Sequence, residues 1–262
     1  MKGAMKRFWA SWNGALMFYT CLPIPQSWPL EFRYVARWVP WVGAVVGGLL
    51  AIADATLAEL YVPDLVRSAL VIALGILLTG GLHLDGVMDT ADGLAVPSSG
   101  SVAESRAKRL EVMADSRMGA FGGMAAIALI LLKVSALSAI VSQRAWVLIA
   151  VAVWGRWGQQ WAIARYPYLK AEGKGAFHQA ALPALVYTLP SLVGIALISA
   201  FCIALGFASW AVVWRTTIGG LLLSVLTSAY FNRQLGGQTG DTYGAVVEWT
   251  EALMLCSLTI GR

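Results

Sequence analysis

The fold is decided by residues 65–93, which read LVRSALVIALGILLTGGL (65–82) followed by HLDGVMDTADG (83–93). The first part is apolar and long enough to cross a membrane as a helix, since a span needs about 17–25 such residues. The second part places Asp85, Asp89 and Asp92 at spacings i, i+4 and i+7, on one narrow face of a helix. A helix bearing carboxylates therefore follows directly after a candidate membrane span.

The composition extends this pattern to the whole chain. Of the 262 residues, 58% are hydrophobic and 13% are charged, whereas soluble domains carry about 25% charged residues. We therefore predict an all-α, polytopic membrane helical bundle that forms a single domain over residues 1–262, with about six to seven transmembrane helices. The predicted spans are Val39–Leu60, Leu65–Leu82, Phe121–Val141, Trp146–Ala164, Leu182–Phe207, Ala211–Phe231 and the shorter Ala245–Ile260.

The basic residues set the predicted orientation. In a membrane protein, Lys and Arg concentrate in cytoplasmic loops, so the net charge of +5 does not indicate nucleic-acid binding. With the N-terminus in the cytoplasm, only Arg67, Arg144 and Arg262 fall in outside segments. The acidic loop at 83–119 then faces the cytoplasm. The three scattered cysteines have no metal-ligand spacing and are expected to pack among apolar residues.

A second acidic pair follows the first, and together the two indicate a metal site. Glu111 and Asp115 repeat the i, i+4 spacing on a predicted helix, Glu104–Arg117. A turn at Pro97–Ser101 allows this helix to fold back on the first, so that five carboxylates converge. Because clustered carboxylates repel one another, we expect them to bind a hard cation, Mg²⁺ with Mn²⁺ as an alternative. His83 alone accompanies the cluster, which disfavours zinc, and its role as substrate contact or span cap stays open.

Basic side chains near this cluster indicate a phosphate-bearing ligand. Arg suits bidentate recognition of phosphate, and a cation site beside it suits a diphosphate. The candidates are Arg106, Arg109 and Arg117 in the acidic loop and Lys174 in the next cytoplasmic segment.

A glycine-rich turn, Gly236–Asp241, opens a further helix. Its backbone around Gly237 and Thr239 is a candidate anion site, because N–H groups at a helix N-terminus attract anions. Asp241 has the simpler alternative of capping that helix. Glu248 and Glu251 follow at the membrane edge and are candidates to contact substrate or to pair with Arg156, which lies inside a predicted span and could pair instead with Asp54.

Four stretches carry a resemblance to a known family: residues 79–93, residues 109–122, Leu22–Pro25, and the turn 236–241 with Gly244, Glu248 and Glu251. Together they resemble the cobalamin synthase family, the adenosylcobinamide-GDP ribazoletransferases. The resemblance implies a Mg²⁺-dependent, multi-pass enzyme of the bacterial inner membrane with its active site facing the cytoplasm. It implies that adenosylcobinamide-GDP is joined to α-ribazole or α-ribazole 5′-phosphate, with release of GMP. The sequence leaves the formation of a homo-oligomer open.

A more distant likeness to the CDP-alcohol phosphotransferases suggests roles within the acidic cluster. By that analogy Asp115 is the candidate general base or positions the attacking hydroxyl, and Asp89, Asp92 and Glu111 are the core metal ligands. Asp85 is then a direct or an outer ligand. We expect Asp92→Ala to abolish turnover without unfolding the protein, because it removes a repelling charge.

Two other functions remain open at this point. Another Mg²⁺-dependent membrane transferase, of the CDP-alcohol phosphotransferase or prenyltransferase type, would need similar acidic motifs. A carboxylate-based cation transporter would also carry acidic groups, but transporters place them near the bilayer midplane rather than in a cytoplasmic loop.

Overall fold

The computed structural model describes residues 2–97, 100–170 and 176–260. They form α-helices and two short 3-10 helices, and the one strand-like contact among them is a bridge between Tyr168 and Gln238, so the all-α prediction is confirmed. In chain order the elements are α1 (Lys2–Tyr19), η1 (Val35–Arg37), α2 (Val39–Glu59), α3 (Asp64–Leu78), α4 (Leu82–Leu94), α5 (Val102–Val112), α6 (Ala120–Ala139), α7 (Arg144–Arg165), α8 (Ala176–Ala181), η2 (Leu185–Thr188), α9 (Leu189–Ala204), α10 (Trp210–Leu235) and α11 (Gly240–Thr259).

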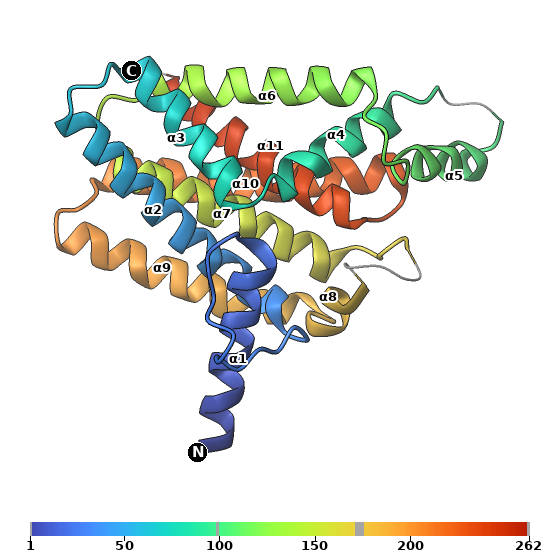
Figure 1. Cartoon of the computed structure of the whole chain (residues 1–262), viewed down its shortest axis with the longest axis horizontal. Coiled ribbons are helices and arrows are strands. Elements are labelled where there is room, and N and C mark those ends of the chain that lie inside the picture. The colour runs from blue at the N-terminus through green and yellow to red at the C-terminus, as the bar shows by residue number, and fades with distance from the viewer. Residues whose placement is uncertain (1, 98–99, 171–175, 261–262) are drawn as a thin grey trace.

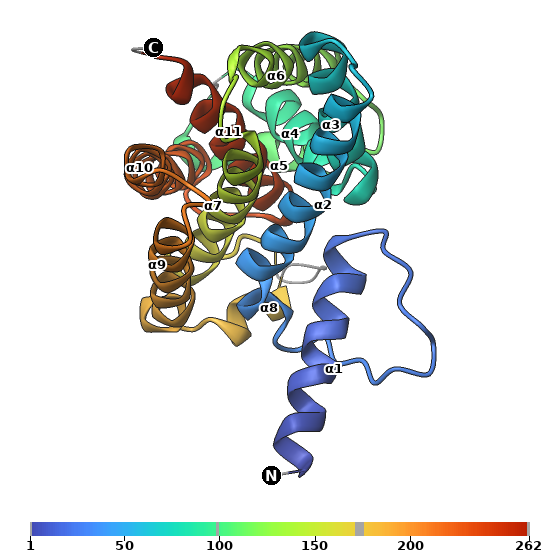
Figure 2. The same ribbon diagram turned by 90° about the vertical axis from the view of Figure 1, so that its left-hand side faces the viewer.

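Helix α7 lies at the centre of the bundle, with α2, α10 and α11 packed around it (Figures 1 and 2). Most of its side chains are buried, and Trp157 is fully buried. The contact with α2 is close because Gly43 and Gly47 of α2 present no side chain. A Cβ on Gly47 would lie 2.6 Å from the Cα of Ile149. Small residues four apart allow such close helix packing in membrane proteins.

The number of candidate spans is lower than predicted. Among the described residues, four segments are long and apolar enough to cross a membrane: Val39–Glu59, Ala120–Ala139, Leu185–Ala204 and Trp210–Leu235. The pair α3 and α4 makes a fifth if counted as one broken span. The predicted spans Trp146–Ala164 and Ala245–Ile260 fall in α7 and α11, which are not among these candidate spans. Both helices are surrounded by others and carry charged or amide side chains that face the protein, so they are less apolar.

The predicted span Leu65–Leu82 is broken. Helix α3 ends at Leu78, α4 begins at Leu82, and the two axes are bent by 89° (Figure 1). Gly80 and Gly81 lie between them with φ values of +60° and +72°, in the left-handed region that favours glycine. The motif that looked like the end of one helix is therefore a corner that turns α4 toward α11.

Helix α1 is anchored to this corner by its C-terminal end, while its N-terminal end points away from the bundle (Figure 2). Tyr19 is buried, and the N–H of Cys21 donates to the carbonyl of Leu78 at 2.8 Å. The side chain of Cys21 is exposed, so the expectation that all three cysteines pack among apolar residues is wrong for this one.

Helix α5 is shorter than predicted and ends at Val112. It starts with a capping box in which Ser101 and Glu104 exchange hydrogen bonds. Asp115 therefore lies in the turn beyond the helix, where its side chain accepts a hydrogen bond from the N–H of Arg117 at 3.0 Å. The predicted helical face shared by Glu111 and Asp115 does not form.

Candidate active site

The acidic face of α4 meets the N-terminal end of α11. Gly86 makes this possible, since a Cβ at that position would lie 2.4 Å from the carbonyl oxygen of Asp241. Asp85 and Asp241 lie close enough to Asp89 for their negative charges to repel its carboxylate, and Lys170 lies close enough for its positive charge to attract it. The Lys170 ammonium lies 3.1 Å from the Asp241 carboxylate. Asp85, Asp89 and Asp241 are hereafter the α4–α11 acidic group.

Asp92 is on the same face of α4 but is held by different partners. Its two carboxylate oxygens accept hydrogen bonds from the N–H groups of Gly119 and Gly122, each at 2.8 Å. These donors belong to the first turn of α6, which has no capping side chain of its own. A Cβ on Gly119 would lie 2.2 Å from the Asp92 carboxylate, so the glycine allows this contact. Asp92 thus caps α6 from a neighbouring helix.

The second acidic pair is placed apart from the first. Glu111 is exposed and pairs with Lys108 at 3.0 Å. Asp115 forms a two-point ion pair with Arg117, and hydrogen bonds from the Arg117 side chain and backbone lower the pKa of Asp115 to about 2. Within the described residues, no three His, Cys, Asp or Glu side chains are grouped closely enough to hold one metal ion. The predicted convergence of five carboxylates is therefore not present in this arrangement.

Two of the four predicted basic residues lie next to the turn at 236–241. The Arg106 guanidinium lies against Gly236, where a Cβ would be 2.5 Å from its Nη1. Arg109 donates from Nη1 to the carbonyl of Gln234 at 3.0 Å. Arg117 is exposed, and Lys174 lies outside the described residues. Two of the predicted phosphate-binding side chains therefore come together at one end of α10.

The glycine-rich turn opens α11 as predicted, but Thr239 rather than Asp241 is the N-cap. The Thr239 hydroxyl accepts a hydrogen bond from the N–H of Thr242, and the Thr242 hydroxyl accepts one from the N–H of Thr239. Asp241 lies in the first helical turn, where a carboxylate is favoured by the helix dipole. A side chain on Gly237 would collide with Leu169, because the turn packs closely on the segment that follows α7.

Four charged side chains form a buried cluster between α6, α7 and α11: Lys133, Arg156, Glu248 and Glu251, hereafter the inner charge cluster. The Lys133 ammonium lies 2.5 Å from Glu248 and 2.6 Å from Glu251. Arg156 pairs with Glu251 at 3.0 Å. The alternative partner for Arg156, Asp54, is paired with Arg144 at 2.6 Å instead. Two cations and two carboxylates balance, which buried charges require.

His83 lies beside the inner charge cluster, close enough for the charges of Arg156 and Lys133 to act on it. Its side chain is 2% exposed, and neither ring nitrogen has a hydrogen-bond partner among the described residues. A Cβ on Gly244 would lie 3.0 Å from the backbone of His83, so α4 and α11 also touch here. Neither the substrate-contact role nor the capping role is visible in these contacts.

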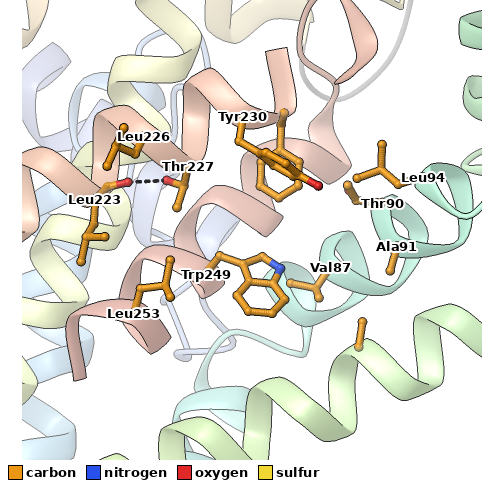
Figure 3. A pocket seen from close by; sticks show the side chains of 12 residues that line it. Val87, Thr90, Ala91, Leu94, Leu223, Leu226, Thr227, Tyr230, Trp249 and Leu253 are labelled. Carbon is orange, nitrogen blue, oxygen red and sulfur yellow. Dashed lines mark hydrogen bonds between the residues drawn. The ribbon is translucent and has the colours of Figure 1, made fainter. Parts of the chain in front are cut away.

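The opposite face of α4 lines a separate apolar cavity of about 470 Å³ (Figure 3). Val87, Ala91 and Leu94 contribute from α4, and Tyr230 and Trp249 from α10 and α11. Among the residues that the structure describes, no charged side chain lines this α4–α10 cavity. Because residues 87, 91 and 94 project away from 85, 89 and 92 on a helix, this cavity is not the phosphate site.

Comparison with known proteins identifies the family of this chain. The family model described as cobalamin-5-phosphate synthase matches residues 11–259. The chain belongs to that family.

Relatives of similar length share between a third and about half of its residues. The adenosylcobinamide-GDP ribazoletransferase of Synechococcus elongatus is 49% identical over 258 residues, covering 98% of this chain and 99% of the relative. That of Trichormus variabilis is 52% identical over 246 residues, covering 94% and 95%. That of Desulfitobacterium hafniense is 34% identical over 264 residues, covering 96% of each. No solved structure matches. The resemblance to the cobalamin synthase family is confirmed.

Two residues of this family member were not among the predicted site residues. Lys133 lies within α6, and a lysine inside a candidate span is itself a sign of function or of a buried partner. Lys170 follows the end of α7 and reaches Asp241 across the bridge between Tyr168 and Gln238. No spacing in the sequence indicates this second contact, because the partners are far apart in the chain.

Proposed function

We propose that this chain transfers the cobinamide phosphate of adenosylcobinamide-GDP to α-ribazole or α-ribazole 5′-phosphate and releases GMP. The observation that carries the proposal is the full-length match to the cobalamin-5-phosphate synthase family, together with ribazoletransferases about 50% identical to this chain. In this reaction a ribose hydroxyl attacks the phosphorus next to cobinamide. The phosphorus–oxygen bond to GMP breaks, and the hydroxyl proton leaves.

The basic side chains around the turn at 236–241 would hold the diphosphate and the leaving GMP. Arg106 and Arg109, both from α5, and Lys170, from the segment after α7, come to this turn. Cations fixed in place lower the energy of the charge that develops on the phosphate oxygens. The N-terminal end of α11 points its first-turn N–H groups into the same region, which also favours an anion.

The α4–α11 acidic group would hold Mg²⁺ only together with the donor, because its three carboxylates are not grouped closely enough to hold the ion by themselves. They offer only carboxylate oxygens, the ligands that this ion prefers, and their mutual repulsion needs a cation to offset it. We therefore assign ion binding to Asp89 and Asp241 together with the donor's diphosphate, since Mg²⁺ is commonly held by one or two carboxylates and substrate phosphates. Asp241 takes the place of the predicted Glu111 and Asp115, and Asp85 lies beside this pair without holding the ion. The ion would neutralise charge on the diphosphate. Asp92, whose two oxygens already accept backbone hydrogen bonds, would instead fix the position of α4 against α6.

Asp115 and Arg117 would act as a pair in the turn after α5. A carboxylate with a pKa of about 2 is a weak base near neutral pH, so Asp115 cannot accept a proton efficiently while Arg117 holds it. A substrate phosphate would compete for the exposed Arg117 guanidinium. Once Arg117 binds phosphate, the pKa of Asp115 rises toward its ordinary range and the carboxylate becomes free for the hydroxyl.

The inner charge cluster would position α4 and α11 rather than touch the phosphates. Its carboxylates are already paired with Lys133 and Arg156, and His83 on α4 packs against Gly244 on α11. The predicted roles of Arg156, Glu248, Glu251 and His83 in the site are therefore indirect in this proposal.

The apolar helices suggest an integral membrane protein. We extend this to the bacterial inner membrane, with the site facing the cytoplasm where nucleotide substrates are found. The excess of Lys and Arg in the segments around the site supports this orientation.

The test is GMP release by purified protein in lipid or detergent. We expect release only when adenosylcobinamide-GDP, α-ribazole or its 5′-phosphate, and Mg²⁺ are all present. A CDP-alcohol with its acceptor, and a prenyl diphosphate with its acceptor, serve as comparison reactions monitored for CMP and pyrophosphate. Release of CMP or pyrophosphate by a folded sample that yields no GMP would overturn the proposal.

A matched pair of variants tests the assignment of the ion site. Asp89→Asn should lower kcat by about 10²–10³-fold, because a carboxylate that would hold the ion against the diphosphate is lost. Glu111→Gln should stay within a few-fold of the parent, because Glu111 is exposed and bound to its neighbour Lys108. Equal losses in the two variants would contradict the assignment.

A further inference from the structure

A second cavity lies at the N-terminal end of α4, where α1 meets the corner between α3 and α4. Its volume is about 710 Å³, within the range of small-molecule sites. We call it the corner cavity. It is lined by Met17, Phe18, Thr20, Cys21, Thr79, Gly80, Gly81, Leu82, Leu84, Asp85 and Met88.

The corner cavity exists because the helix breaks. Gly80 and Gly81 adopt left-handed backbone conformations, and a Cβ on Gly80 would lie 2.8 Å from Sγ of Cys21. The chain after α1 returns to this corner through the hydrogen bond between Cys21 and Leu78. Two segments distant in sequence therefore form the walls of one open site.

The charge of its lining separates this cavity from the rest of the candidate active site. Asp85 is the one charged residue in the lining, and the remainder are apolar, hydroxyl, thiol or glycine residues. One turn further along α4, about 6 Å away along the helix axis, Asp89 faces the Asp241–Lys170 pair. Cations are thus present on the nucleotide side of α4 and absent from the lining of the corner cavity.

The two halves of the proposed donor differ in the same way. The GDP half is a polyanion and requires cations, which the corner cavity does not offer. The cobinamide half is a large macrocycle with an apolar face, amide side chains and a cationic cobalt centre. An apolar wall with hydroxyl groups and one carboxylate suits that half, and Asp85 complements its positive charge.

We propose that the corner cavity binds the corrin ring of the donor, so that the donor lies across α4 with its ring beside Cys21 and its nucleotide toward Arg106. This inference rests on the proposed function. The α4–α10 cavity is a poorer candidate, since it has no charged residue and lies on the other face of α4. A lipid acyl chain is the alternative occupant of the corner cavity, and the test distinguishes the two.

The exposed thiol of Cys21 makes the site measurable. The other cysteines, Cys202 and Cys256, are half-buried, so a Cys202→Ser/Cys256→Ser background leaves Cys21 as the single target for a maleimide. We expect adenosylcobinamide without the nucleotide, at ten times its dissociation constant, to slow Cys21 alkylation about tenfold. GMP and α-ribazole should leave the rate within twofold. Mass spectrometry of the wild-type chain gives the same readout if the background fails to fold.

A substitution pair provides a second, kinetic readout. Met17→Trp fills the corner cavity from α1 and should raise KM for the donor about tenfold or more without changing KM for α-ribazole. Met5→Trp is the matched control, since it places the same side chain at an exposed position of the same helix outside the lining. Its KM values should equal those of the parent.

The outcomes separate this inference from the proposed function. Protection of Cys21 by GMP instead of adenosylcobinamide, or by neither in a sample that releases GMP, overturns the inference alone. Protection by phospholipid vesicles that adenosylcobinamide cannot reverse points to an acyl chain and also overturns it. A folded sample that releases no GMP from both substrates overturns the proposed function, whichever ligand protects Cys21.

Discussion

The acidic side chains of this protein fall into two regions that the sequence presents as equivalent. In the interior, Asp92 and Glu248 are bound by groups 27 to 115 residues away in the chain. At the end of the bundle, Glu111 and Asp115 are bound by Lys108 and Arg117, three and two residues away. Asp92 and Glu248 hold separate helices together, whereas Glu111 and Asp115 are neutralised by basic residues next to them in the chain. Spacing along the sequence does not tell these cases apart, because burial and distant partners decide them.

The sharpest test of this difference is to remove one lysine from each region. Lys133→Met leaves Glu248 and Glu251 buried beside Arg156 alone and should destabilise the protein by about 3–5 kcal/mol. Lys108→Met removes an exposed partner and should change stability by less than about 0.5 kcal/mol. Thermal unfolding in one detergent measures both. Similar shifts in the two variants would show that the inner charge cluster is not buried as described.

Asp92 gives the next largest expected effect. Asp92→Ala leaves the N–H groups of Gly119 and Gly122 without their acceptor and should cost about 2–4 kcal/mol. Glu111→Ala, the control from the outer region, should cost almost nothing. This result would reverse the expectation from spacing, under which Asp92→Ala leaves the fold intact. Urea-induced unfolding followed by Trp fluorescence measures both, and a fully stable Asp92→Ala protein would remove the capping role.

Two glycines, Gly119 at the N-cap of α6 and Gly123 within the helix, provide a further comparison. Gly119→Ala places a Cβ 2.2 Å from the Asp92 carboxylate, so we expect a loss of about 1–3 kcal/mol from overpacking. Gly123→Ala meets no atom within 4 Å and should be neutral or stabilise α6 by up to about 1 kcal/mol. Melting temperatures of the two variants should therefore move in different directions. A neutral Gly119→Ala would mean that Asp92 does not contact α6.

The smallest effect is expected at Arg117. Arg117→Gln should raise the pKa of Asp115 from about 2 toward its ordinary range. A carboxylate with a lowered pKa contributes stability above its unfolded-state pKa and loses that contribution as the pH falls through about 2. The parent therefore has this contribution throughout pH 5–9 and the variant lacks it, so stability should fall slightly and by the same amount across that range, while donor KM rises if Arg117 binds phosphate. Titration of Asp115 by NMR checks the pKa, and an unchanged value would contradict the ion pair.

Much of the fold could be predicted from local sequence patterns. Apolar runs indicate α2, α6, α9 and α10, the acidic face of α4 follows from its spacing, and the turn at 236–241 does open α11. These features depend on residues a few positions apart, which periodicity reports directly.

The parts that could not be predicted depend on distant contacts. Gly86 indicates a close approach, but not that Asp241 is the neighbour. Lys133 is visible as a charge in a span, but its two partners lie more than 100 residues away. The end of α5 at Val112 is a different case, because the contact there is local. Asp115 accepts a hydrogen bond from the N–H of Arg117 in the turn after the helix, and the spacing of Glu111 and Asp115 does not reveal this.

The cap that Asp92 provides to α6 has a practical consequence for the segment between them. Asp92 lies near the end of α4 and Gly119 stands just before α6, so one carboxylate joins the end of the first helix to the start of the second. A change in the length of the chain between these two helices would therefore leave the position of α4 against α6 held by the same contact.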